Sequence, residues 1–285
     1  MSDNAFGSTG PDSHASAFGT WNGIAVSWHR WIPRIREWYA PATSMMLDLA
    51  RIGPGSRVLD VAAGDGDQSL AAAERVGSGG YVLATDPAAE LLAFAQRSAE
   101  QADVENLEIR VMEGENLELC DGSFDAVICR FGLMFFSDPD RGLVEMNRVL
   151  RRGGRVSLVV YGVEGSPEFS LALSVVQRFL GLSEHGPVSA TSLGVQGVLE
   201  QKLRSAGFSE VEVHNMTLQI GMASAAECVS YLRATSPTLQ GTLSSSSPEE
   251  CKEAWKQIEQ ALSRFQTAAG FEVDHSVLIG AGSAA

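Results

Sequence analysis

Residues 58–67 read VLDVAAGDGD, an apolar run that passes into a turn of small and acidic residues. The apolar run predicts a buried strand, and residues 68–76 have the spacing of a helix, so the turn joins a strand to a helix. Gly64 and Gly66 let a ligand approach the backbone, and the first N–H groups of the helix have no partner within it. This stretch therefore predicts a ligand pocket at the end of the first strand.

Short β-rich runs alternate with helical stretches through the rest of the chain, which is typical of a parallel sheet built from βαβ units. We expect strands over residues 57–62, 81–86, 107–112, 124–130, 155–161, 211–220 and 273–279. We expect helices over residues 68–76, 88–101, 140–150, 168–180, 198–206, 225–234 and 248–268. These patterns predict an α/β fold.

Three segments stand outside this alternation. The first 18 residues are small and polar and cannot bury enough apolar surface to offset the entropy of ordering. The next segment carries aromatic residues at helical intervals, and Pro33 and Pro41 favour the first turns of new helices over helix interiors, so two or three short helices are expected. The predicted division is a mobile tail over 1–18, an N-terminal helical lid over 19–52, and a main domain over 53–285 with lid insertions near 163–200 and 222–270.

The composition argues against several classes of function. The 21 basic and 35 acidic side chains give a formal charge of −14 at pH 7, which would repel a nucleic-acid backbone. The four cysteines are scattered and no histidines cluster, so neither a metal site nor a disulfide framework is predicted. No apolar run is long enough to cross a bilayer, and the start of the chain lacks the order of a signal peptide, so we expect no membrane span and a cytoplasmic location.

Two acids follow the ends of predicted strands. Asp86 ends the second strand, 20 residues after Gly66, where a carboxylate can accept the hydroxyl protons of a ribose. An aspartate there can also cap the helix that follows Pro87. Glu113 ends the third strand, where it can accept a hydrogen bond from an adenine amino group or lie in a solvated loop. Together the two acids favour a nucleoside ligand along one edge of the sheet.

Several ordered motifs give the sequence a family resemblance. They are DVAAGDGD at 60–67, Asp86, EGENL at 113–117, SFDAVI at 123–128, RFGLMFF at 130–136 and VLRRGGR at 149–155. In these motifs the sequence resembles the class I S-adenosylmethionine-dependent methyltransferases, most of all the ubiquinone/menaquinone-biosynthesis type. The resemblance implies a Rossmann-like, seven-stranded, mostly parallel sheet with helices on both faces, an N-terminal helical lid and inserted helices, and S-adenosyl-L-methionine as the cofactor.

The resemblance also implies a set of cofactor-binding residues. The chain departs from the family pattern at Ala62, the first position of the usual glycine triad, and at Asp67, which replaces a glycine, while Glu113 stands where the family often has aspartate. The residues implied are Asp60, Ala62, Gly64 and Gly66 around the methionine moiety, Asp86 and Pro87 at the ribose, Glu113 and Gly114 at the adenine, and Arg130 and Phe131 at the methionyl end.

Two other functions stay open at this point. One is an NAD-dependent oxidoreductase, because such enzymes also begin with a strand, a small-residue turn and a helix. Asp65 and Asp67 argue against it, because these acids would repel a pyrophosphate over the turn, whereas the cationic cofactor tolerates them. The other is a non-catalytic protein that binds S-adenosylmethionine without transferring a group.

Aromatic residues are concentrated ahead of the first predicted strand, where they can either line a substrate pocket or anchor the N-terminal helices to the core. Pro33 is expected to divide them between two helices. Aromatic faces suit both an apolar substrate and the sulfonium charge. The candidate substrate residues are Trp21, Trp28, Trp31, Trp38 and Tyr39, with Met134 and Phe135 added by the resemblance.

A general base is needed only if the acceptor atom must lose a proton as it attacks the methyl group. The candidates are His29 and His185, and each is more simply read as a surface or packing residue because no carboxylate partner is recognisable by spacing. His214 and His275 lie on late strands and are weaker candidates. The acceptor atom, carbon, nitrogen or oxygen, stays open, as does a homo-oligomeric state. The expected substrate is a small hydrophobic molecule, such as an aromatic, indole or isoprenoid specialised metabolite of a bacterium.

Overall fold

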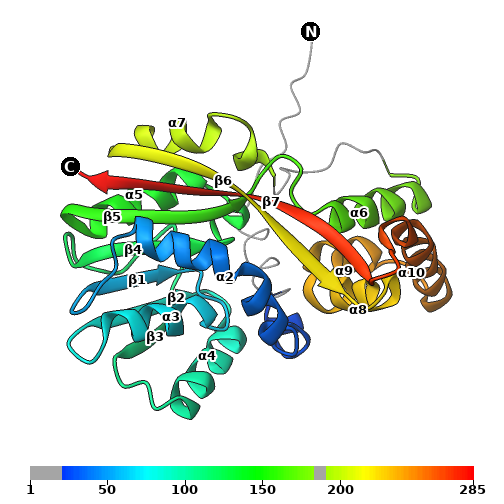
Figure 1. Ribbon diagram of the computed structural model, residues 1–285, viewed down its shortest axis with the longest axis horizontal. Coiled ribbons are helices and arrows are strands. Elements are labelled where there is room, and N and C mark those ends of the chain that lie inside the picture. Colours follow the sequence, from blue (N-terminus) through cyan, green and yellow to red (C-terminus); the bar gives the residue numbers. More distant parts are fainter. Residues whose placement is uncertain (1–20, 183–190) are drawn as a thin grey trace, which may run out of the picture.

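The computed structural model describes residues 21–182 and 191–285, and a single seven-stranded sheet lies at its centre (Figure 1). The strand order is β3-β2-β1-β4-β5-β7-β6, and β7 is antiparallel to both of its neighbours while the other pairs are parallel. The strands are β1 (Arg57–Val61), β2 (Tyr81–Asp86), β3 (Leu107–Val111), β4 (Phe124–Arg130), β5 (Leu150–Tyr161), β6 (Phe208–Met222) and β7 (Phe271–Ala284). The predicted mostly parallel α/β sheet is confirmed.

Helices cover both faces of this sheet. On one face α2 and α3 pack in a core that continues into α6, α8 and α10, and on the other face α5 and α7 pack in a second core. The helix bounds are α2 (Ile32–Leu49), α3 (Asp67–Val76), α4 (Ala89–Gln101), α5 (Pro139–Val149), α6 (Pro167–Phe179), α7 (Val198–Ser205), α8 (Ala225–Thr235), α9 (Pro237–Leu243) and α10 (Pro248–Leu262). Short 3-10 helices lie at Leu133–Phe135, Ser192–Gly194 and Ser263–Phe265.

The expectation that both early prolines start new helices is correct for one and wrong for the other. Residues 21–29 are helical, a turn at residues 30–31 interrupts the helix, and Pro33 lies in the first turn of α2. Pro41 lies inside α2, which continues past it to Leu49. Pro41 is exposed, so the carbonyl that loses its helical N–H partner can face water, and the packing of the opposite side of α2 holds the helix together.

The last two strands extend beyond the body of the sheet as a two-stranded ribbon. β7 pairs with β5 only from Val277 onwards, whereas its pairing with β6 begins at Phe271, opposite Met222. Helices α8, α9 and α10 are inserted between these two strands, and α6 contacts both α9 and α10 (Figure 1). The ribbon therefore carries a helical cluster at its end.

Candidate functional site

The site lies where the strand order reverses, between the carboxyl ends of β1 and β4. From β1 the chain proceeds outward to β2 and β3, then returns to β4 on the other side, and such a switch point forms a crevice for a ligand. Ala62 and Phe131, which follow these two strands, have positive φ angles of 56° and 59°. Gly132 permits the close approach, because a Cβ on it would lie 2.3 Å from the Cβ of Ala62. Strained non-glycine residues of this kind are concentrated at functional sites.

The two glycines of the turn have different roles. Gly64 has a φ of +60° and nothing within 4 Å of the position that a Cβ would take, so its face is open to a ligand. Gly66 has a φ of +78°, and a Cβ there would lie 2.7 Å from the Cβ of Ala95 on α4. Gly64 thus leaves room for a bound molecule, while Gly66 allows the turn to pack beneath α4.

Asp86 ties the turn to the second strand. Its carboxylate accepts the N–H of Gly64 at 2.9 Å and the N–H of Ala88 at 2.8 Å. Burial raises the pKa of Asp86 to about 6 against the effect of these two bonds. Each oxygen has a second lone pair, so the geometry fits both readings of this residue, the support of the next helix and the acceptance of ribose hydroxyls.

Asp60 is fully buried below the same turn. Its carboxylate accepts the hydroxyl of Ser69 and, at 3.2 Å, the side-chain amide of Gln68, both in the first turn of α3. Burial raises its pKa to about 7 despite these bonds. Asp60 therefore holds the start of α3 in place under the ligand space.

Two more acids lie at the turn, Asp67 paired with arginines and Asp65 with an unpaired oxygen. Asp67 forms an ion pair with Arg130 at 2.9 Å and a second one with Arg36. Burial, followed by the charge of Asp67, raises the pKa of Asp65 to about 7. Among the described residues, Oδ2 of Asp65 has no hydrogen-bond partner, and it lies 3.6 Å from Nδ1 of His29, which also has none. The unpaired oxygen of Asp65 can accept a hydrogen bond from the ammonium group of S-adenosylmethionine, whereas a pyrophosphate has no donor to offer it.

The predicted adenine residues lie at the end of the third strand. Glu113 is exposed just after β3, and Gly114 beside it is buried. A Cβ on Gly114 would lie 2.3 Å from the ring of Phe136 and 2.7 Å from Val61. The glycine is needed for packing, while the exposed acid is left at the edge of the sheet.

The helix of residues 21–29 covers this edge. Trp21 contacts the ring of Phe135 at 5.3 Å and that of Trp28 at 5.5 Å. Ala25 packs with Ala88 and Leu91 at the start of α4. His29 stacks on Phe94 at 4.1 Å between ring centroids, beside Asp65. Of the two predicted bases, His29 thus lies near the cofactor turn, and His185 lies outside the described residues.

The remaining substrate candidates lie nearer to the helical cluster or to the end of β5. Trp31 and Trp38 contact Tyr231 of α8 at 5.2 and 5.4 Å. Met134 is buried, and its sulfur accepts the N–H of Tyr161 at 3.3 Å. Tyr39 is buried, and its hydroxyl is hydrogen-bonded to Nδ1 of His275 at 2.7 Å.

Sequence reasoning missed Tyr161 and Glu168 and named His275 only as a weaker candidate base. The three residues meet near Phe131, whose ring stacks on that of Tyr161. Tyr161 ends β5, Glu168 begins α6 and His275 lies on β7. A signal for the histidine was present, because every second residue from 271 to 277 is buried, and the buried residues other than His275 are apolar. A histidine in such an alternation faces the core and requires buried partners.

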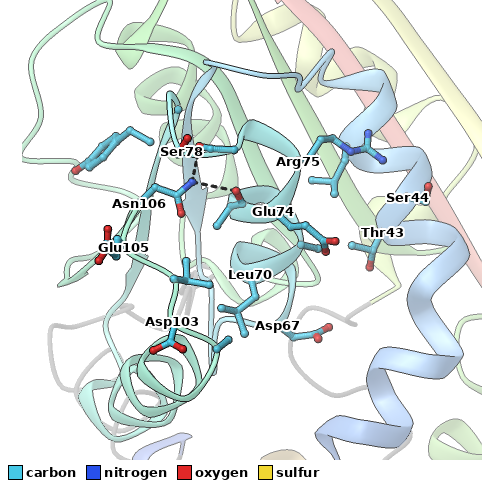
Figure 2. Close-up of a pocket in the computed structure, with 18 of the residues that line it drawn as sticks. Thr43, Ser44, Asp67, Leu70, Glu74, Arg75, Ser78, Asp103, Glu105 and Asn106 are labelled. Carbon is cyan, nitrogen blue, oxygen red and sulfur yellow. Dashed lines mark hydrogen bonds between the residues drawn. The ribbon is translucent and has the colours of Figure 1, made fainter.

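A large open groove, about 1360 Å³ in volume, lies elsewhere (Figure 2). It runs along α3 between α2 and the loop before β3, near the amino ends of β2 and β3, and of the turn residues only Asp67 lines it. The side chain of Asn106 closes one wall by donating to the carbonyl oxygens of Ala73 and Gly77 at 3.0 and 2.8 Å. The groove lies near the amino ends of the strands, whereas the switch-point crevice lies at their carboxyl ends, so the two are separate.

Comparison with known proteins agrees with this geometry. A family profile described as a methyltransferase domain matches residues 58–154. An uncharacterized protein of Mycobacterium tuberculosis is 40% identical over 129 residues, which are 45% of this chain and 46% of that protein. The chain therefore matches about half the length of that relative.

Two further matches cover a larger share of the matched protein's own length. The demethylmenaquinone methyltransferase of Thermus thermophilus is 34% identical over 177 residues, 57% of this chain and 79% of that enzyme. The solved structure of the YcgJ protein from Bacillus subtilis aligns over 86% of this chain and 99% of its own, with a TM-score of 0.58 and 20% identity, so it shares the fold. The chain belongs to the S-adenosylmethionine-dependent methyltransferases. Within them it is related to the ubiquinone/menaquinone-biosynthesis type.

Proposed function

We propose that this protein transfers a methyl group from S-adenosylmethionine to a small, largely apolar metabolite. The observation that carries the proposal is the turn after β1, where an open Gly64 lies beside the anchored carboxylate of Asp86 and above buried acids. When bound, S-adenosylmethionine supplies a methyl group activated by a sulfonium charge. The protein has to orient that group, hold the acceptor in line and exclude water.

Individual residues are suited to these tasks. Gly64 leaves space for the methionyl backbone, and Asp86 presents free lone pairs to the ribose hydroxyls. Glu113 can reach an adenine amino group from the end of β3. Phe131 lies between this turn and the rings of Tyr39 and Tyr161, so it marks the boundary between the donor and acceptor sides.

The acceptor side favours an apolar ring. Phe131, Met134 and Tyr161 form its inner wall, and the helical cluster of α6, α8, α9 and α10 together with residues 21–29 is placed to act as a lid. The relative from Thermus thermophilus is named for demethylmenaquinone, which agrees with an apolar ring as the substrate class, and we extend the proposal to specialised metabolites of this kind.

We place the activity in the cytoplasm. All four cysteines are described and all are free thiols, which is typical of a reducing compartment. In the described part of the chain, no helix combines the length and apolar character needed to cross a bilayer, and no group of three or more potential ligands could hold a metal ion.

Calorimetry with S-adenosylmethionine, S-adenosylhomocysteine and NAD tests the cofactor assignment. We expect both adenosyl compounds to bind and NAD not to bind. Asp86→Ala should weaken binding by about 2 to 4 kcal/mol through loss of charge-assisted bonds to the ribose. Asp86→Asn, which retains the side-chain shape, should lose less affinity for S-adenosylmethionine. Asp274→Ala, at an exposed position of β7, should leave that affinity unchanged. Wild-type affinity in a folded Asp86→Ala variant, or binding of NAD alone, would contradict the proposal.

A further inference from the structure

Four polar side chains from four elements form one buried chain of hydrogen bonds beside Phe131. The hydroxyls of Tyr161 and Tyr39 are 3.0 Å apart, and the hydroxyl of Tyr39 is 2.7 Å from Nδ1 of His275. Nε2 of His275 is 2.8 Å from Oε1 of Glu168. Tyr39 comes from α2, Tyr161 from β5, Glu168 from α6 and His275 from β7, so the fold brings together residues that are distant in sequence.

This chain runs from the interior toward the ligand space. Glu168 is 0% exposed, His275 is 1% exposed and Tyr39 is 3% exposed, whereas Tyr161 is half-buried. Tyr161 is therefore the least buried of the four residues, and it stands at the opposite end of the hydrogen-bond series from Glu168. The ring of this tyrosine is stacked at 4.7 Å on Phe131, the residue that follows β4 at the switch point.

The hydrogen bonds of these four residues also run in one direction. Oε1 of Glu168 accepts the hydroxyl of Ser166 at 2.7 Å and lies 2.8 Å from Nε2 of His275, an arrangement that suits a carboxylate accepting two hydrogen bonds. A carboxylate only accepts, so Nε2 of His275 carries a proton and donates it to Glu168. In the tautomer with this single N–H, Nδ1 accepts the hydroxyl proton of Tyr39. The oxygen of Tyr39 then accepts from Tyr161. Every donor points toward Glu168, and the oxygen of Tyr161 keeps its lone pairs for an incoming O–H group.

We propose that Tyr161 is a catalytic residue that takes a proton from a hydroxyl acceptor, and that Tyr39, His275 and Glu168 act through it as a relay. The proposal rests on the proposed methyl transfer and narrows its acceptor to a phenol or enol of an apolar ring. As the acceptor oxygen attacks the methyl carbon, the carbon–sulfur bond breaks and its electron pair stays on sulfur. The acceptor proton moves to Tyr161, the proton of Tyr161 moves to Tyr39, and the proton of Tyr39 moves to Nδ1 of His275.

The end state of this relay is an imidazolium beside a carboxylate. Neither tyrosine has to rest as a phenolate, which agrees with burial raising the pKa of Tyr161 to about 12. The other titratable groups that act on the relay are Tyr231 and Cys228 of α8 and Arg130 of β4. Arg130 is paired with Asp67 at 2.9 Å, and Glu168, whose Oε1 lies 2.8 Å from Nε2 of His275, is the carboxylate in direct contact with the imidazolium.

A purely structural role explains these four hydrogen-bonded residues less well than a catalytic one. Within the described residues, Oε2 of Glu168 has no hydrogen-bond partner although it is buried. Buried ionic groups of this kind are often replaced by apolar residues with no loss of stability. Their presence beside the ligand space points to chemistry at the exposed end.

Binding of 4-nitrophenol in the presence of S-adenosylhomocysteine tests the relay without turnover, because the ionised phenol absorbs visible light. We expect the wild-type protein to lower the apparent pKa of bound 4-nitrophenol by about one pH unit, a tenfold change in its ionisation constant. Tyr161→Phe and His275→Gln should abolish that change, and Glu168→Gln should reduce it. His214→Gln, which alters a half-exposed histidine of β6, is the matched control and should behave as wild type.

Two further measurements support the reading of this test. Nitrogen NMR of the wild-type protein should show His275 as the Nε2–H tautomer at neutral pH, which does not depend on how any variant folds. With a phenolic substrate, Tyr161→Phe should lower kcat by about 100-fold or more while KM for S-adenosylmethionine stays unchanged.

Failure of the relay is distinguishable from failure of the proposed function. If calorimetry shows no binding of S-adenosylhomocysteine, the methyltransferase assignment fails. If that ligand binds but 4-nitrophenol is not ionised, is not bound, or is ionised equally by Tyr161→Phe, the relay is overturned. An Nδ1–H tautomer of His275 would also overturn it.

Discussion

Asp65 provides a quantitative test of the electrostatics of the cofactor turn. Its side chain is 5% exposed, and Oδ2 has no hydrogen-bond partner in the described part of the protein. Burial and the neighbouring Asp67 raise its pKa from 3.8 to about 7. Because each pKa unit corresponds to about 1.4 kcal/mol, the ionised carboxylate costs the unliganded protein up to about 4 kcal/mol.

The sign of the pH dependence follows from this direction. A carboxyl whose pKa is higher in the folded state stabilises the fold below its unfolded pKa and loses that contribution as pH rises through the folded pKa. The wild-type protein should therefore lose stability from Asp65 between about pH 4 and pH 7. Asp65→Asn removes the buried charge, and its amide can donate to Nδ1 of His29 after a small movement, because the present distance to that atom is 3.6 Å.

Urea unfolding of the unliganded protein at several pH values measures the effect. We expect Asp65→Asn to raise the free energy of unfolding by about 2 to 4 kcal/mol at pH 8 and by a much smaller amount at pH 4. Asp274→Asn, at an exposed position, should show no such trend. A gain that is independent of pH, or a variant less stable than wild type at pH 8, would refute this account of the turn.

Two further predictions concern the glycines and the covering helix. Gly64→Val has room for its side chain, because nothing lies within 4 Å of the Cβ position, but the φ of +60° strains a β-branched residue. We therefore expect a lower melting temperature, together with loss of S-adenosylmethionine binding by the folded variant in calorimetry. Gly66→Ala should lower the melting temperature because its Cβ would lie 2.7 Å from that of Ala95. Normal affinity for S-adenosylmethionine in Gly64→Val would contradict the role of Gly64 in binding. An unchanged melting temperature in Gly66→Ala would contradict the role of Gly66 in packing. Removal of residues 1–30 should reduce turnover at least about tenfold with a smaller change in cofactor affinity, because it exposes the edge at Ala88 and Leu91 to water. Full activity of the 31–285 fragment would rule out a lid, and a large fall in melting temperature would favour an anchoring role.

Local patterns predicted most of the sheet and much less of the acceptor side. The strands of the first half and the turn at Gly64 follow from apolar runs and small residues that are contiguous in sequence, so short windows suffice. The error at Pro41 arose because a helix with one well-packed face tolerates a proline on its exposed face. Helix α9 was missed because its seven residues lie between two turn signals, at Ser236 and Ser244.

The relay residues could not be assembled from the sequence, because no spacing relates them. Glu168 and His275 are 107 positions apart, and they meet only because β7 leaves the sheet beside the start of α6. Burial of His275 was predictable from the alternation of β7, but its partners depend on tertiary packing. The same limit applied to Asp86, whose bond to Gly64 depends on the parallel pairing of β1 and β2.

The ribbon of β6 and β7 has an evolutionary consequence. Met222 and Phe271 are paired across the ribbon, so the insertion that carries α8, α9 and α10 leaves and re-enters the fold at one point. The entropy of closing a loop grows slowly with its length, so a segment with adjacent ends can be lengthened, shortened or exchanged with little effect on the sheet. Recombination at these two positions would exchange α8, α9 and α10, which we propose as part of the lid over the acceptor, while leaving Gly64 and Asp86 in place. A lineage could in this way acquire new substrates by exchanging one cassette, without having to evolve its methyl-donor site again.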